Sequence, residues 1–315
     1  MDGPIIQIND LVKNYDTNTA VDHLNLDIRK GEIFGLLGPN GAGKTTIILS
    51  MLGLSEPTSG MVMVKGHDST TEPLKVKKIT GYLPDDVGFS GNSTGLENLV
   101  YTAMLNGIPR NEAIESAEEL LEMVDLKEAG HKKTKTYSKG MTQRLGLADV
   151  MIKDPEIMVL DEPTIGIDPK GINEFLDLIR NLSKEKGMTV LLSSHLLHQV
   201  QKICDRVGIL VEGKLLAQGK VDDLANELFG GKDTSITAEV SPITDELIQA
   251  LSEKEGIKEI QGNGEVITMK GNRDVAPVIS QTIVQNNAKL YRLSYKEYGL
   301  DEIYQHYFEG GTTDV

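Results

Sequence analysis

The chain has 315 residues, of which 39% are hydrophobic and 25% charged, a balance typical of a soluble globular protein with about two domains. Basic residues number 32 and acidic residues 47, and the resulting net charge of −15 argues against a nucleic-acid binder, which needs a positive field along phosphates. The sequence has no run of about 18 apolar residues and no secretory signal, and its single cysteine, Cys204, fits a reducing compartment.

The first predicted elements are short strands. Residues 5–8 and 24–28 are apolar segments separated by turn residues, and they predict a small antiparallel β layer. Residues 33–37 form an apolar run that stops at a glycine-rich turn, which indicates a buried strand, and a helix is predicted over residues 47–52.

The glycine-rich turn between that strand and that helix matches the pattern G-x-x-x-x-G-K-T. Glycines let the main chain wrap around phosphate oxygens, and the helix N-terminus adds a partial positive charge. Lys44 is predicted to contact the β and γ phosphates, Thr45 to bind Mg²⁺ and Thr46 to donate to an α-phosphate oxygen. A plain turn that caps a helix is the alternative, but it gives the Lys-Thr pair no purpose. The predicted nucleotide-binding residues of the loop are Gly38, Pro39, Asn40, Gly41, Ala42, Gly43, Lys44 and Thr45.

Further along, helices and buried strands alternate. Residues 97–124 are mostly helical and predict a helical subdomain, and a helix is predicted over residues 170–182. Buried strands are predicted at 157–160 and 189–192. This alternation indicates an α/β fold with a parallel sheet covered by helices on both faces.

Two acids end the strand predicted at 157–160. Asp161 is predicted to hold Mg²⁺ through water, and Glu162 to polarise the attacking water from the strand tip. The alternative is that both acids are solvated residues that open a turn.

Several segments together resemble the ATP-binding-cassette family. The resemblance covers roughly residues 5 to 220 and implies a P-loop NTPase core with an antiparallel β layer and a helical subdomain. Its parts are the signature-like Tyr137-Ser138-Lys139-Gly140-Met141-Thr142-Gln143-Arg144, the sequence Asp161-Glu162-Pro163-Thr164, the D-loop Ile165-Gly166-Ile167-Asp168-Pro169, the switch histidine His195 and the adenine-stacking aromatic Tyr15.

The family resemblance implies a dimer. In this family two cassettes pack head to tail, so that each ATP lies between one phosphate loop and the signature of the partner. Ser138, Lys139, Gly140 and Met141 are therefore expected to bind the partner's ATP, with the Ser138 hydroxyl donating to the γ-phosphate and Gly140 allowing close approach. His195 is expected to bridge the γ-phosphate and the attacking water. The alternative for His195 is a packed or surface histidine, and the alternative for Tyr15 is an aromatic residue anchored on the surface.

The sequence departs from the family pattern at two places. Lys139 replaces a glycine of the signature and Met141 a glutamine, as is frequent in one exporter branch. Asp85 stands where most members place a glutamine that contacts Mg²⁺ and the attacking water. An acid can still reach Mg²⁺, so Asp85 is a candidate metal and catalytic residue. The alternative is that Asp85 only caps the following loop.

The last part of the chain predicts a second domain. After the glycine-rich linker at 230–233, the predicted order is strand, helix, strand, strand, helix and strand, with a hairpin turn at Asn263-Gly264 and a last helix near 300–308. The sequence thus predicts an ATP-binding-cassette domain over 1–229 and a small ferredoxin-like α+β domain over 235–315. The second domain is expected to support dimerisation or to sense a ligand.

Together, the motifs and the family resemblance predict an ATP-hydrolysing subunit of an exporter, with ATP and Mg²⁺ as cofactors. Its expected partners are a second copy or a homologous cassette subunit and a separate membrane permease, and nucleic acid is not among them. We expect a cytoplasmic protein held at the inner face of the membrane through that permease. An importer ATPase and a soluble cassette ATPase acting on ribosomes or DNA are the alternatives.

Overall fold

The chain folds into two compact units. The computed structural model describes residues 3–229, 234–271, 273–295 and 299–310. The first unit comprises the chain up to Val221 together with the residues from Tyr307 on, and the second comprises Asp222–His306.

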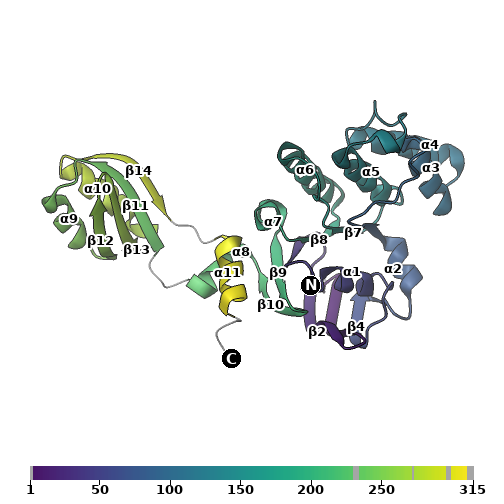
Figure 1. Ribbon diagram of the computed structural model, residues 1–315, viewed down its shortest axis with the longest axis horizontal. Coiled ribbons are helices and arrows are strands. Elements are labelled where there is room, and N and C mark those ends of the chain that lie inside the picture. The colour runs from purple at the N-terminus through teal and green to yellow at the C-terminus, as the bar shows by residue number, and fades with distance from the viewer. Residues whose placement is uncertain (1–2, 230–233, 272, 296–298, 311–315) are drawn as a thin grey trace. The chain divides into compact units, whose positions relative to one another are not determined.

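The first unit contains the expected antiparallel layer, with strand order β2-β1-β4-β5 (Figure 1). Strands β1 and β2 pair over most of their length and extend well beyond the predicted segments 5–8 and 24–28. Their buried residues lie on one face, which packs on the core beneath, as in a sheet that is solvated on its other side. The strands are β1 (Ile6–Tyr15), β2 (Asn18–Ile28), β4 (Ser59–Val64) and β5 (His67–Asp68).

A six-stranded sheet of order β10-β9-β3-β8-β7-β6 forms the centre of the first unit. Its strands are β3 (Ile33–Leu37), β6 (Thr80–Leu83), β7 (Ile157–Asp161), β8 (Thr189–Ser194), β9 (Arg206–Val211) and β10 (Lys214–Gly219). Only β10 is antiparallel to its neighbour. Every residue of β3, β7 and β8 is buried, as expected of parallel strands covered on both faces. The carboxyl ends of β3, β8, β7 and β6 therefore lie side by side at one edge, where ligands bind in open α/β sheets.

Some helices of the first unit pack on this sheet, and three others form a cluster of their own. Helices α3, α4 and α5 group together, as the predicted helical subdomain requires (Figure 1). Side chains define the helix ends: Thr94 and Glu97 form a capping box at α3, and Asp168 caps α6. The helices of this unit are α1 (Lys44–Met51), α2 (Pro73–Ile79), α3 (Gly95–Leu105), α4 (Arg110–Met123), α5 (Lys139–Met151), α6 (Pro169–Lys186) and α7 (Leu197–Ile203).

The second unit has the element order β-α-β-β-α-β and a four-stranded antiparallel sheet of order β12-β13-β11-β14. This is the arrangement of a ferredoxin-like unit, with α9 and α10 packed on a core that includes Ile236, Ile267 and Ile279. Asn263 pairs with Val266, so the hairpin turn lies at Gly264-Glu265, one residue later than predicted. The elements are β11 (Thr234–Ser241), α9 (Asp245–Ser252), β12 (Ile257–Asn263), β13 (Val266–Gly271), α10 (Ala276–Gln285) and β14 (Lys289–Tyr295).

The remaining helices are α8 (Val221–Phe229) and α11 (Leu300–Gly310). The Phe229 ring of α8 packs edge-on against His306, with 5.9 Å between the ring centroids. The second unit begins at Asp222, so it includes all of α8 except Val221, and the boundary between the units precedes the one predicted at residue 229. The predicted linker 230–233 lies outside the described residues. Among the described helices, none combines the length and the apolar character needed to span a bilayer.

Candidate active site

The phosphate loop connects β3 to α1. Gly41 and Gly43 have φ values of 83° and 103°, a region that disfavours residues with a Cβ. A Cβ on Gly43 would also collide with the main-chain carbonyl of Ala20. Glycine is therefore required at position 43. The main-chain N–H groups in the first turn of α1 lie directly after this loop, and the N-terminus of a helix suits an anion.

Lys44 begins α1 and is only 5% exposed. Its ammonium group donates to the carbonyl oxygens of Gly38 at 2.8 Å and Pro39 at 3.1 Å. It also lies 3.2 Å from Glu162 Oε1 as a buried ion pair. The loop thus holds a full positive charge next to its own backbone and next to an acid from the end of β7.

Asp161 ends β7 and is 1% exposed. The Thr45 hydroxyl donates to Asp161 Oδ2 at 2.8 Å, and the Ser193 hydroxyl donates to Oδ1. Both carboxylate oxygens are therefore oriented, one of them toward the phosphate loop. A hydroxyl beside a fixed carboxylate is the oxygen donor set that Mg²⁺ prefers, so these residues fit the predicted metal.

Glu162 follows Asp161 and is 7% exposed, with a left-handed φ of 49° that is uncommon for a residue with a side chain. Its N–H donates to the carbonyl and the hydroxyl of Ser193, at 3.2 and 3.0 Å. Glu162 Oε2 lies 2.9 Å from His195 Nδ1. Lys44, Glu162 and His195 therefore form a continuous row of side chains in which the Glu162 carboxylate is central.

His195 follows β8, and 35% of its side chain is exposed. The five residues Lys44, Thr45, Asp161, Glu162 and His195 thus meet at the carboxyl ends of three neighbouring strands. Ser193, which orients both acids, was not among the predicted site residues. Its signal was the polar pair Ser193-Ser194 at the end of an otherwise apolar strand.

Asp85 lies in the exposed loop after β6, at the same edge of the sheet. Its Oδ1 accepts a hydrogen bond from the N–H of Asp86 at 2.9 Å, a contact expected if Asp85 caps the following loop. Burial, with a smaller effect from the charges of Asp161 and Asp85, raises the pKa of Tyr82 to about 12.

The signature-like segment begins α5. Ser138 caps this helix by accepting a hydrogen bond from the Met141 N–H at 3.3 Å, which leaves its O–H able to donate. Asp168 caps α6 in the same way, through the Gly171 N–H at 3.2 Å. Tyr15 is 45% exposed at the end of β1, and the Lys13 ammonium lies 4.8 Å from its ring centroid.

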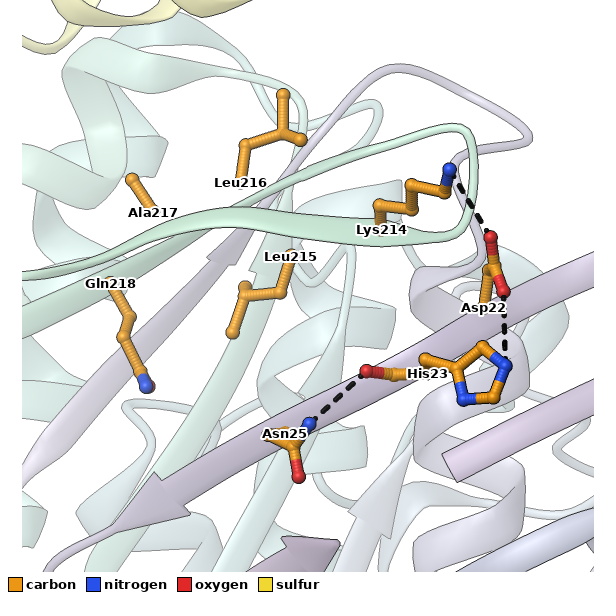
Figure 2. A pocket seen from close by; sticks show the side chains of 8 residues that line it. All are labelled: Asp22, His23, Asn25, Lys214, Leu215, Leu216, Ala217 and Gln218. Atoms are coloured by element: carbon orange, nitrogen blue, oxygen red, sulfur yellow. Dashed lines mark hydrogen bonds and ion pairs between the residues drawn. The ribbon is translucent and has the colours of Figure 1, made fainter. Parts of the chain in front are cut away.

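A surface cavity of about 620 Å³ lies elsewhere, between β2 and β10 (Figure 2). Its polar rim contains Asp22, His23 and Lys214, with the Lys214 ammonium 3.3 Å from an Asp22 carboxylate oxygen. A hydrogen bond that His23 donates to the Asp10 carboxylate, assisted by the Asp10 charge, raises the pKa of His23. No residue of the phosphate loop lines this cavity, so it is separate from the site at the strand ends.

A phosphate loop with a buried lysine, beside two acids at the end of β7, defines a phosphate-loop nucleotide triphosphatase. The ABC transporter family profile matches residues 21–165. The chain belongs to the ATP-binding proteins of ABC transporters, and it is an ATPase that binds nucleotide.

Two relatives support this assignment. The bacitracin transport ATP-binding protein BcrA of Bacillus licheniformis is 42% identical over 70% of this chain and 71% of its own length. The uncharacterized ABC transporter ATP-binding protein YhcH of Bacillus subtilis is 34% identical over 92% of this chain and 91% of its own length. The second match includes most of the ferredoxin-like unit.

Solved structures give the same fold. CbiO1 of Clostridium perfringens, part of the transporter complex cbiONQ, is 27% identical with a TM-score of 0.65, over 73% of this chain and 92% of its own. The dimeric cassette MJ0796 bound to ADP and phosphate is 24% identical with a TM-score of 0.64, over 68% of this chain and 98% of its own.

Proposed function

We propose that this ATPase is the energy-supplying subunit of an exporter, in which two cassettes close on ATP and drive a separate membrane permease. The row Lys44–Glu162–His195 supports the hydrolysis part of the proposal, because Glu162, the proposed base, lies 3.2 Å from the lysine of the phosphate loop. The bacitracin transport protein among the relatives supports a transport role. ATP binds the closed dimer better than the open one, so binding shifts that equilibrium and hydrolysis releases it.

Each residue of the phosphate-loop half has a proposed role. The loop N–H groups and Lys44 bind the β and γ phosphates, Thr46 donates to an α-phosphate oxygen, and Tyr15 stacks on adenine. Thr45 and Asp161 hold Mg²⁺, which, when bound, neutralises charge on the phosphates. Glu162 accepts the proton of the attacking water, and its bond to His195 Nδ1 orients that ring toward the γ-phosphate.

The other half of the site comes from a second copy of the chain. The Ser138 hydroxyl, which accepts the Met141 N–H, can still donate its proton at the start of α5, where the helix N-terminus also favours an anion. Asp168 lies in the D-loop beside it. We propose that these residues face the ATP held by the partner subunit and that the ferredoxin-like unit, with residues 235–315 as an accessory domain, supports this dimer.

The test of the whole proposal is purification of the tagged full-length chain from membranes and from cytosol. We expect the purified chain to hydrolyse MgATP. We also expect a multispanning permease to copurify with the tagged chain from the membrane fraction, where the chain lies at the inner face of the membrane. A chain that neither hydrolyses ATP nor copurifies with a membrane protein contradicts the proposal. Copurification with ribosomes at physiological salt, in place of a permease, supports the soluble class instead.

Asp85→Gln restores the residue that most family members carry. If Asp85 contributes to the metal site, the Mg²⁺ concentration for half-maximal hydrolysis should change by about tenfold, as for other groups near a metal. Binding of a fluorescent ATP analogue without Mg²⁺ should stay unchanged. The matched control is Asp86→Asn in the neighbouring exposed acid. Unchanged Mg²⁺ dependence would assign Asp85 to loop capping alone, as its bond to the Asp86 N–H already indicates.

A further inference from the structure

Lys139 occupies the signature position where the family has glycine, and its side chain contacts two loops of its own subunit. The ammonium group donates to the main-chain carbonyl of Asp85 at 3.4 Å. The aliphatic stem lies over Gly166 of the D-loop, where an added Cβ would be 2.9 Å from Lys139 Cγ. The lysine therefore spans the space between the Asp85 loop and the D-loop, which no glycine could do.

The Asp85 loop follows one face of α5. Residues 139, 146 and 150 are spaced by seven and four positions, and this spacing places them on the same side of a helix. A Cβ on Gly146 would lie 3.4 Å from Val87, and one on Gly81 would collide with Val150. The segment from Gly81 to Val87 thus lies along this face of the helix, and Lys139 contacts it at Asp85, near the start of the helix.

The D-loop also contacts the first turn of this helix. An added Cβ on Gly140 would lie 3.7 Å from Ile167 Cγ2, so the start of α5 rests on the D-loop. The D-loop begins three residues after Glu162. The first turn of α5 is therefore packed between the loop that carries Asp85 and the loop that follows the proposed catalytic base.

We propose that Lys139 is a positioning residue that fixes the Asp85 loop against the D-loop, so that engagement of the signature with the partner's ATP also sets the position of Asp85. This proposal rests on the roles proposed above for the signature and Asp85. A competing use of the same ammonium group is direct contact with the partner's γ-phosphate. The two uses differ in what they require: the first needs the Asp85 side chain to matter, and the second does not.

A double-mutant cycle separates them. Steady-state hydrolysis by the full-length protein is measured for Lys139→Met and Asp85→Ala, alone and combined. We expect Lys139→Met to lower kcat by about tenfold with little change in the KM for ATP, as for loss of an outer positioning contact. In the Asp85→Ala background the same change should have no further effect. Lys139→Arg, which can still donate, should restore most of the activity.

Lys132→Met serves as the control. Lys132 is an exposed lysine in the segment before α5, and this substitution removes the same charge as Lys139→Met. Lys139→Gln repeats the cycle with a side chain that keeps most of the stem, in case the methionine variant folds poorly. An equal loss in the Asp85→Ala background, or a raised KM with kcat kept, assigns the lysine to the partner's phosphate and overturns the proposal. Full activity of Lys139→Met overturns it too, whereas an inactive wild-type chain would contradict the proposed function itself.

Discussion

Glu162→Gln is expected to lower ATP turnover by roughly 10²–10⁴-fold, the range that general-base catalysis contributes, while ATP binding persists. The amide has nearly the shape of the carboxylate and can still accept the hydrogen bond at His195 Nδ1, but it cannot take a proton from water. The change also removes the negative charge next to Lys44, which leaves that ammonium group more available to a phosphate. Bound ATP should therefore persist and trap the closed dimer.

Two measurements check this expectation. Phosphate release gives turnover, and size-exclusion chromatography with MgATP reports the trapped dimer. Glu156→Gln is the control, because Glu156 is an exposed acid in an ion pair with Lys65 on the surface of the same unit. Turnover at the wild-type rate would show that Glu162 is not the base and would move that role toward Asp85 or His195.

The sequence predicted the motifs of the site because each one is local. The phosphate loop and the Asp161-Glu162 strand end are short runs with a fixed pattern, and the strands and helices around them have strong hydrophobic periodicity. The order β-α-β-β-α-β of the second unit was predictable for the same reason. The boundaries of β1 and β2 were too short in the prediction because a half-exposed strand interrupts its apolar pattern at every second residue.

The hydrogen bonds that join the motifs were not predictable, although Thr45 and Asp161 were both predicted to bind Mg²⁺. The bond from Thr45 to Asp161 spans 116 residues, and it exists because β3 and β7 lie on either side of β8, an order that no local pattern encodes. Ser193 orients both acids from β8 for the same reason. Strands β6, β9 and β10 were not predicted, although β6 carries the chain into the Asp85 loop. The left-handed backbone of Glu162 is likewise set by its bonds to Ser193 and not by its residue type.

Lys44→Met is expected to abolish detectable ATP hydrolysis and also to destabilise the protein without nucleotide. The methionine keeps a stem of similar length but removes the charge that offsets the buried Glu162 carboxylate. Breaking a buried ion pair by removing one partner costs about 3–5 kcal/mol, because the remaining charge is left uncompensated. His195 is only partly buried and lies on the other carboxylate oxygen, so it is a weaker substitute for the ammonium group.

The Glu162→Gln background tests that reason directly. With a neutral amide at position 162, Lys44→Met leaves no buried charge, so its penalty in urea unfolding should fall by about 1–3 kcal/mol relative to the single variant. Hydrolysis stays absent in both backgrounds, because the phosphate contact of Lys44 is lost either way. Equal penalties in the two backgrounds would mean that Lys44 stabilises the loop through the carbonyls of Gly38 and Pro39 alone, and that the acid and the lysine are independent before ATP binds.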